Sequence, residues 1–159
     1  MFDTTRMVRD GIVFAFVAAS YLLVLLRCNP RMFLRHYPKE VQAVVPPRSG
    51  KERRIAGISG LLIGLPLASA LFWRTATSRG HSFGEHFIYA FGVLCIFNLV
   101  DLIVLDWLIV CWIEPRWVIL PGTEHLVIPK QYRHHFNGFL IGTAGIVVVS
   151  VAIAAILAW

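Results

Sequence analysis

Four long runs of apolar residues constrain this chain more than any other feature of its sequence. They cover residues 11–26, 55–73, 87–113 and 138–159, and are 16, 19, 27 and 22 residues long. A helix needs about 20 apolar residues to cross the hydrocarbon core of a bilayer. The first run is short, but Arg27 can extend its side chain into the headgroup region, so this run also predicts a span. The sequence therefore predicts an all-α integral membrane protein, a four-helix bundle forming a single membrane domain over residues 1–159.

Composition agrees with this fold class and excludes others. The chain is 57% hydrophobic and only 15% charged, and its mean hydropathy is +0.69. So little charge excludes a disordered chain, and so much apolar surface does not fit a soluble globular domain. Three cysteines in 159 residues are too few for a secreted scaffold held together by disulfides.

The distribution of basic residues predicts the orientation. Of the 15 Lys and Arg residues, 11 lie in the two connections 27–54 and 114–137, and four lie on the other side. The positive-inside rule places the more basic side in the cytoplasm. We therefore expect a multi-pass protein of the plasma (inner) membrane with a basic cytoplasmic loop, a partly ordered second cytoplasmic loop, and both termini outside.

The basic residues also indicate partners. Each Lys or Arg beside an anionic leaflet gains about 1 kcal/mol, so we expect membrane lipids, including anionic headgroups near residues 27–54, as partners. Nucleic acid is not expected, because no soluble basic domain with interleaved aromatic residues is present.

Small residues recur at helical spacing in two of the runs. In the second run they are Gly60, Gly64 and Ala68, and in the fourth run they are Gly138 and Gly142. A four-residue spacing of small side chains allows two helices to approach closely. It predicts tight packing inside one bundle, and leaves open a homo-oligomer or a larger membrane partner as the packing surface.

The third run contains Asn98, Asp101 and Asp106. Two acids near the centre of a membrane helix cost roughly 5 to 7 kcal/mol. The 17 Leu, Ile, Phe and Val residues of this run favour membrane insertion by only roughly 5 to 10 kcal/mol. Insertion therefore has little surplus free energy, and the acids are expected to face the protein interior rather than lipid. At 100° per residue in an α-helix, Asp106 lies about 140° around the helix from Asp101, whereas Asn98 and Asp101 share a face.

Two interpretations of these acids follow. As neutral carboxylic acids they hydrogen-bond to hydroxyl groups and hold helices together. As a functional site they bind a proton, a cation or a polar group of a substrate, which is the usual role of ionisable residues inside a membrane.

The connection after the third run supplies further polar candidates that we expect to converge near Asp106: Glu114, Glu124, His125, His134 and His135. Adjacent residues on a helix point about 100° apart, so only one of His134 and His135 is expected to face a given ligand, and His135 is taken as the candidate. Carboxylate and imidazole groups can bind a divalent metal or transfer protons. No H-E-x-x-H or C-x-x-C motif is present, and two histidines at one depth on facing helices, as haem requires, are hard to find. Haem and a divalent metal therefore both stay open, and neither is favoured.

Three functions are compatible with these features. The first is binding or transport of a proton, a cation or a small polar substrate at Asn98, Asp101 and Asp106. The alternative is a membrane-embedded enzyme that acts on a lipid or isoprenoid substrate at the cytoplasmic mouth, with Asp106, Glu114, Glu124 and His135 as its polar groups. The third is an accessory subunit of a larger membrane complex. Whether the chain is an enzyme is left open at this stage.

Overall fold

The computed structural model describes residues 3–78, 82–126 and 130–159, and all of its regular elements are helical. Its elements, in chain order, are α1 (Thr4–Cys28), the 3₁₀-helix η1 (Pro30–His36), α2 (Lys39–Val44), α3 (Gly50–Ala76), α4 (Phe83–Val100), the π-helix η2 (Asp101–Ile113) and α5 (Tyr132–Leu157). Helix η2 continues α4 without a break, so that Phe83–Ile113 is one long span.

The predicted fold class is confirmed. Within the described ranges, four helices are long and apolar enough to cross a membrane: Thr4–Cys28, Gly50–Ala76, Phe83–Ile113 and Tyr132–Leu157. The first three each contain one of the predicted apolar runs, and the fourth contains its run except for the last two residues, Ala158 and Trp159. The helices extend beyond the runs because polar residues at their ends continue or cap them. Ser49, for example, accepts the Glu52 backbone N–H, and Glu52 accepts the Ser49 N–H in return, a capping box that begins α3.

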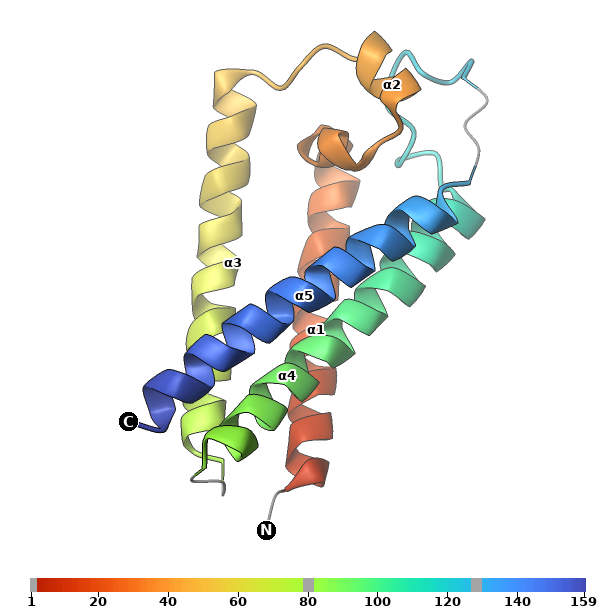
Figure 1. Ribbon diagram of the computed structural model, residues 1–159. Helices are drawn as coiled ribbons and strands as arrows, with labels where there is room; N and C mark the ends of the chain where they lie inside the picture. The colour runs from red at the N-terminus through yellow and green to blue at the C-terminus, as the bar shows by residue number, and fades with distance from the viewer. Residues whose placement is uncertain (1–2, 79–81, 127–129) are drawn as a thin grey trace.

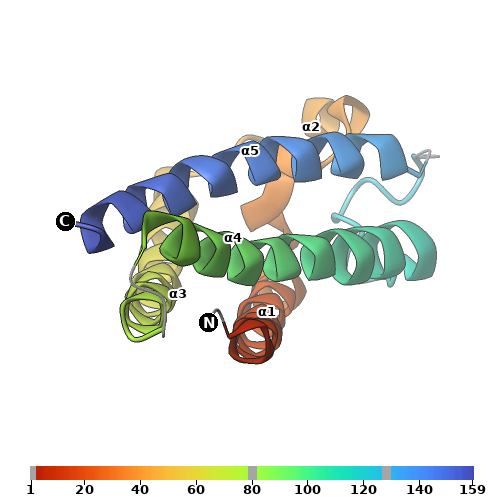
Figure 2. The same cartoon turned by 60° about the horizontal axis from the view of Figure 1, so that its bottom comes forward.

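The four spans are not equally embedded in the bundle. Helix α4 lies between α1 and α5 and packs along both (Figures 1 and 2). Helix α3 stands beside this trio, and its buried residues, Leu71 and Thr75, both belong to its last two turns. Both chain termini lie at one end of the bundle, which we call the terminal end (Figure 1). The other end, which we call the loop end, carries η1, α2 and residues 114–126.

An ionic cluster around Asp10 joins three helices at the terminal end. Arg74 of α3 donates two hydrogen bonds to the Asp10 carboxylate of α1, at 2.6 and 2.7 Å. The Tyr89 hydroxyl of α4 donates to the same carboxylate. Arg6 donates to the backbone oxygen of Thr77 at 2.6 Å. The sequence analysis used these arginines only to predict orientation, and nothing in the local pattern pairs them with Asp10.

The predicted small-residue packing is wrong for most of its positions within this chain. A Cβ atom added at Gly60, Gly64 or Gly138 meets nothing within 4 Å, and Ala68 is exposed. Gly142 does pack closely, because its added Cβ lies 3.0 Å from the Asn98 side-chain oxygen. Small residues permit close approach but do not supply a partner, and no helix among the described residues packs against Gly60 and Gly64 in the middle of α3.

The close approach between α1 and α4 uses other glycines. A Cβ added at Gly11 of α1 would lie 2.5 Å from the Cδ1 atom of Ile96, and one added at Gly92 of α4 would overlap the sulfur of Met7. At Gly11 the added Cβ would also lie 3.1 Å from the Cβ atom of Ile96, which is fixed to the α4 backbone, so glycine allows the close approach of α1 and α4 there. The Met7 side chain at Gly92 is flexible and can shift.

The loop end is packed as well. Leu34, Val41, Val45 and Leu120 form a buried apolar cluster, which ties the connection after η2 to η1 and α2. The Tyr37 hydroxyl donates to the backbone oxygen of Val118 at 2.7 Å. Burial raises the pKa of Tyr37 to about 12, so this hydroxyl keeps its proton at neutral pH. The 114–126 segment is thus packed against η1 and α2 at the loop end of the bundle.

Candidate functional site

A cavity of about 420 Å³ lies at the loop end, bordered by α1, η1, η2, the 118–123 segment and the start of α5. This volume falls within the range of about 300 to 1,000 Å³ that is usual for small-molecule sites. Five of the six predicted site residues line it: Asn98, Asp101, Asp106, Glu114 and His135. The cavity is therefore the place where the polar residues of the third and fourth spans meet.

The two acids share the cavity because η2 is a π-helix. In a π-helix each backbone N–H bonds to the carbonyl five residues earlier, as the Glu114 N–H does to Ile109 at 2.9 Å. Residues five apart are then stacked about one turn from each other, and both Asp101 and Asp106 line the cavity. The expectation that they lie about 140° apart and face different neighbours is wrong, because it assumed the 3.6-residue turn of an α-helix.

Asp106 makes a close contact with a histidine of the next span, which is an ion pair when the imidazole is protonated. The Nδ1 atom of His135 lies 3.0 Å from the Oδ2 atom of Asp106, and the two side chains are only 11% and 27% exposed. A carboxylate only accepts, so a hydrogen bond between these two atoms would require the proton on Nδ1. The Nε2 atom has no hydrogen-bond partner among the described residues, and His135 lines the cavity. The imidazole can therefore offer an acceptor nitrogen to a bound molecule.

Asp101 differs from Asp106 in having no hydrogen bond or ion pair with any residue that the structure describes. It lies closer to the middle of the Phe83–Ile113 span than Asp106 does, and it borders the cavity. A carboxyl group in such surroundings is costly unless water, a proton or a cation satisfies it.

Asn98 has a structural partner instead. Its side-chain nitrogen donates to the backbone oxygen of Phe139 at 3.1 Å and to the hydroxyl of Thr143 at 3.0 Å. Both acceptors lie on α5, so the Asn98 amide joins α4 to α5 beside the close contact at Gly142. Asn98 borders the cavity, but its donor group is already occupied.

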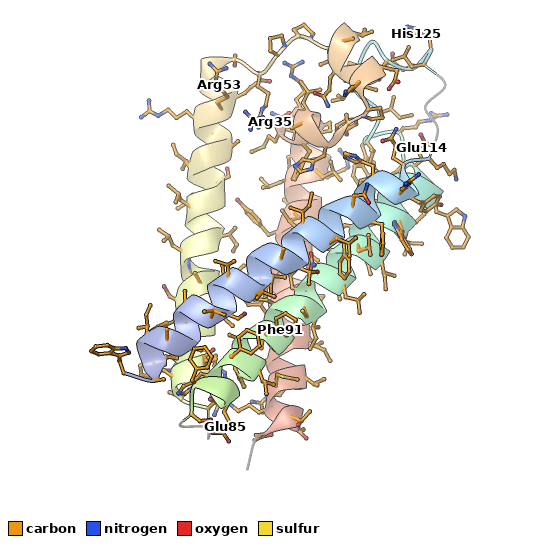
Figure 3. The ribbon with its side chains drawn as sticks, viewed as in Figure 1. Arg35, Arg53, Glu85, Phe91, Glu114 and His125 are labelled. Atoms are coloured by element: carbon orange, nitrogen blue, oxygen red, sulfur yellow. The ribbon has the colours of Figure 1, made fainter. Side chains whose placement is uncertain are left out.

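The remaining predicted acids are placed differently. Glu114 ends η2 in a left-handed backbone conformation, with φ of 46°, and its exposed side chain lines the rim of the cavity. Glu124 does not reach the cavity, because its carboxylate accepts the backbone N–H of Gly122 at 2.8 Å and braces a turn in which Gly122 has φ of 88°. Figure 3 shows Glu114 at the end of η2 and His125 on the outer loop.

Two further histidines line the cavity, His36 from η1 and His134 from α5, so that both of the adjacent His134 and His135 border it. Burial lowers the pKa of His36, and the charge of Asp106 opposes this shift. No local pattern could have placed His36 in the site. It ends η1, and more than sixty residues of sequence separate it from Asn98, the first of the predicted site residues that line the cavity. Despite these imidazoles, no three His, Cys, Asp or Glu side chains of the described residues converge closely enough to hold a metal ion.

Comparisons of this chain with protein-family models, with curated proteins and with solved structures find no match. The chemistry of the cavity is therefore the basis for assigning a function.

Proposed function

We propose that this polytopic membrane protein binds a small ligand in the loop-end cavity, and that the ligand is a proton, a cation or a polar substrate held by Asp101, Asp106 and His135. Transport of that ligand across the plasma membrane is the corresponding physiological role. In this proposal the loop end faces the cytoplasm, as the excess of Lys and Arg in residues 27–54 and 114–137 favours.

The observation that carries the proposal is the 3.0 Å contact between Asp106 and His135 inside the cavity. A carboxylate this close favours the imidazole tautomer with the proton on Nδ1, as carboxylate–histidine pairs do in many binding and catalytic sites. A positive charge in this part of the cavity would lie near the carboxyl groups of Asp101 and Asp106, which both line it. The pair is therefore built to respond to a proton or a positive charge.

The same contact supports the alternative of a membrane-embedded enzyme, because an imidazole beside a carboxylate is also the arrangement of a general base.

An anionic lipid substrate held by the basic loop has less support. Arg31 of that loop is paired with Glu52 at 2.8 Å, Arg48 donates to the Met32 backbone oxygen at 2.8 Å, and neither lines the cavity. An accessory role is supported only by the open glycine face of α3, which a second copy of the chain, a larger partner or lipid can cover.

Thermal unfolding of the purified full chain in detergent tests the proposal. Sodium, magnesium and choline chlorides are compared at matched ionic strength, and the pH is varied separately. Each is tested on the wild type, Asp101→Asn, Asp106→Asn and the control Glu124→Gln. A ligand at a hundredfold excess over its Kd stabilises the folded state by about 2.7 kcal/mol. We expect at least one cation, or the proton, to stabilise the wild type and the Glu124→Gln control. The same ligand should stabilise neither Asp101→Asn nor Asp106→Asn.

Equal shifts in all four proteins would show that the salts act on exposed charges and would contradict the proposal. So would the absence of any ligand-dependent or proton-dependent shift in the wild type.

A further inference from the structure

We infer that the ligand of the loop-end cavity is a small organic cation, an amine or ammonium group on an apolar body, with Asp101 as its counter-ion. This inference rests on the proposed function, because it takes the cavity to be a ligand site and names the class of molecule that fits it.

The charge of the cavity wall favours a cation. The whole chain has a formal net charge of +6, and the loop end carries most of its basic residues. Yet the described residues that line the cavity include three carboxyl groups, Asp101, Asp106 and Glu114, against a single lysine, Lys130, and no arginine. Lys130 is exposed at the rim. An anion would have to enter an acidic pocket, whereas a cation is attracted by it.

The rest of the wall favours an organic cation over a metal ion. Most of the lining is apolar, and aromatic rings come from three segments: Phe33 of η1, Tyr37, and Phe139 of α5. Aromatic faces attract weakly hydrated ammonium groups. A metal ion would need several oxygen or nitrogen ligands, and the part of the chain seen in the structure brings no three such side chains together.

Among the three acids, Asp101 is the one available to pair with the ligand. Asp106 already faces His135 at 3.0 Å, and Glu114 is exposed at the rim. Asp101 has no partner among the described residues and lies deepest of the three along the Phe83–Ile113 span. An ammonium group beside it would compensate a charge that the protein itself leaves unpaired. His36 and His134 also face the cavity and, when neutral, do not repel a cation.

Cys111 provides a reporter inside the cavity. It is a free, buried thiol that lines the cavity, while Cys28 and Cys95 do not. In a Cys28→Ser, Cys95→Ala background, the rate of modification of Cys111 is measured with a cationic aminoethyl, an anionic sulfonatoethyl and a neutral methyl methanethiosulfonate. Each rate is divided by the rate of the same reagent with a free thiol in solution. We expect the cationic reagent to exceed the anionic one by at least about tenfold, and this ratio to fall towards one in Asp101→Asn but not in Glu124→Gln.

Occupancy is tested with choline and with its uncharged isostere, in which a quaternary carbon replaces the nitrogen. We expect choline to protect Cys111 from the neutral reagent at concentrations at which the isostere does not, and this protection to be lost in Asp101→Asn. Equal protection by both compounds would overturn the inference in favour of an apolar ligand, and a faster anionic reagent would overturn it in favour of an anion.

The rates measured in the Cys28→Ser, Cys95→Ala background with Asp101 intact test the inference even if Asp101→Asn fails to fold. A Cys111 that reacts with none of the three reagents would show that the cavity is not accessible and would also overturn it. If choline gives no protection while sodium, magnesium or protons still stabilise the wild type but not the cavity variants, the proposed function stands and the organic cation is excluded. If neither effect is found, both fail.

Discussion

Three aspartates in the membrane-spanning helices differ in the partners of their carboxyl groups. Asp10 accepts hydrogen bonds from Arg74 and Tyr89, Asp106 faces His135, and Asp101 has no partner in the described part of the chain. A fully paired acid serves to join helices, whereas an acid without a partner beside a cavity is a candidate for binding. The partners of each residue, rather than its type, therefore separate the structural acid from the candidates for binding.

Asp10→Ala is expected to destabilise the bundle by about 2 to 4 kcal/mol, because it leaves the Arg74 guanidinium and the Tyr89 hydroxyl without their acceptor. Arg9→Ala is the matched control. Arg9 also contacts Asp10, at 3.2 Å, but its side chain is 64% exposed, so it contributes less than about 1 kcal/mol. Both are measured by unfolding in detergent. Equal losses for the two variants would show that Asp10 is not the joint between α1, α3 and α4.

Tyr37 predicts a loss of stability at high pH. Its pKa is raised from 10.0 to about 12 by burial, so the unfolded chain releases this proton at lower pH than the folded one. The contribution of Tyr37 is therefore fully present below pH 10 and is lost as the pH rises towards 12. Unfolding measured across this window should show a smaller decline in Tyr37→Phe than in the wild type. Identical pH profiles would contradict the buried position of this phenol.

At the scale of the helices, the π-helical turn of η2 decides what the third span presents to the cavity. An α-helix over Asp101–Ile113 would point one of its two acids away from the cavity, whereas the π-helix stacks them. Such widened turns are frequent at functional sites. The loop-end half of this span therefore differs from α4 in its geometry and in what it borders, since η2 lines the cavity and α4 mainly packs between α1 and α5.

Glycine substitutions distinguish helix contacts that the chain makes from those it leaves open. Gly11→Leu should cost about 2 to 3 kcal/mol of unfolding free energy, because the new side chain would overlap Ile96 in the contact between α1 and α4. Gly64→Leu is the control on α3, where an added Cβ meets nothing within 4 Å, and should leave the monomer's stability unchanged. A large loss at Gly64 would instead reveal a second chain packed on this face.

At the scale of the whole molecule, the number of spans and the proposed orientation together predict which segments a reagent can reach from outside the cell. With four spans, both termini lie at the same end of the bundle (Figure 1). In a background without cysteines, an impermeant thiol reagent applied to intact cells should label Thr5→Cys. Lys51→Cys and Glu124→Cys, at the loop end, should react only after the cells are permeabilised. Labelling of the loop-end positions in intact cells would invert the proposed orientation.

The length and apolarity of the runs were sufficient to predict four spans and an all-α fold. Both properties are local: about 20 apolar residues cross the bilayer, and in lipid their backbone groups must bond within the helix. The identity of the candidate acids followed from equally local reasoning, because a carboxyl group inside a membrane span is costly wherever its helix packs.

Only the tertiary structure decided how the helices pair and what each polar residue meets. The contact between Asp106 and His135, the joint at Asp10 and the place of His36 in the cavity all bring together residues that lie far apart in the sequence. The glycines of α3 follow the packing pattern and remain open, while Gly11 and Gly92 pack closely. The physical reason is that local sequence sets which contacts a helix face can make, whereas the partner of that face depends on the packing of the whole bundle.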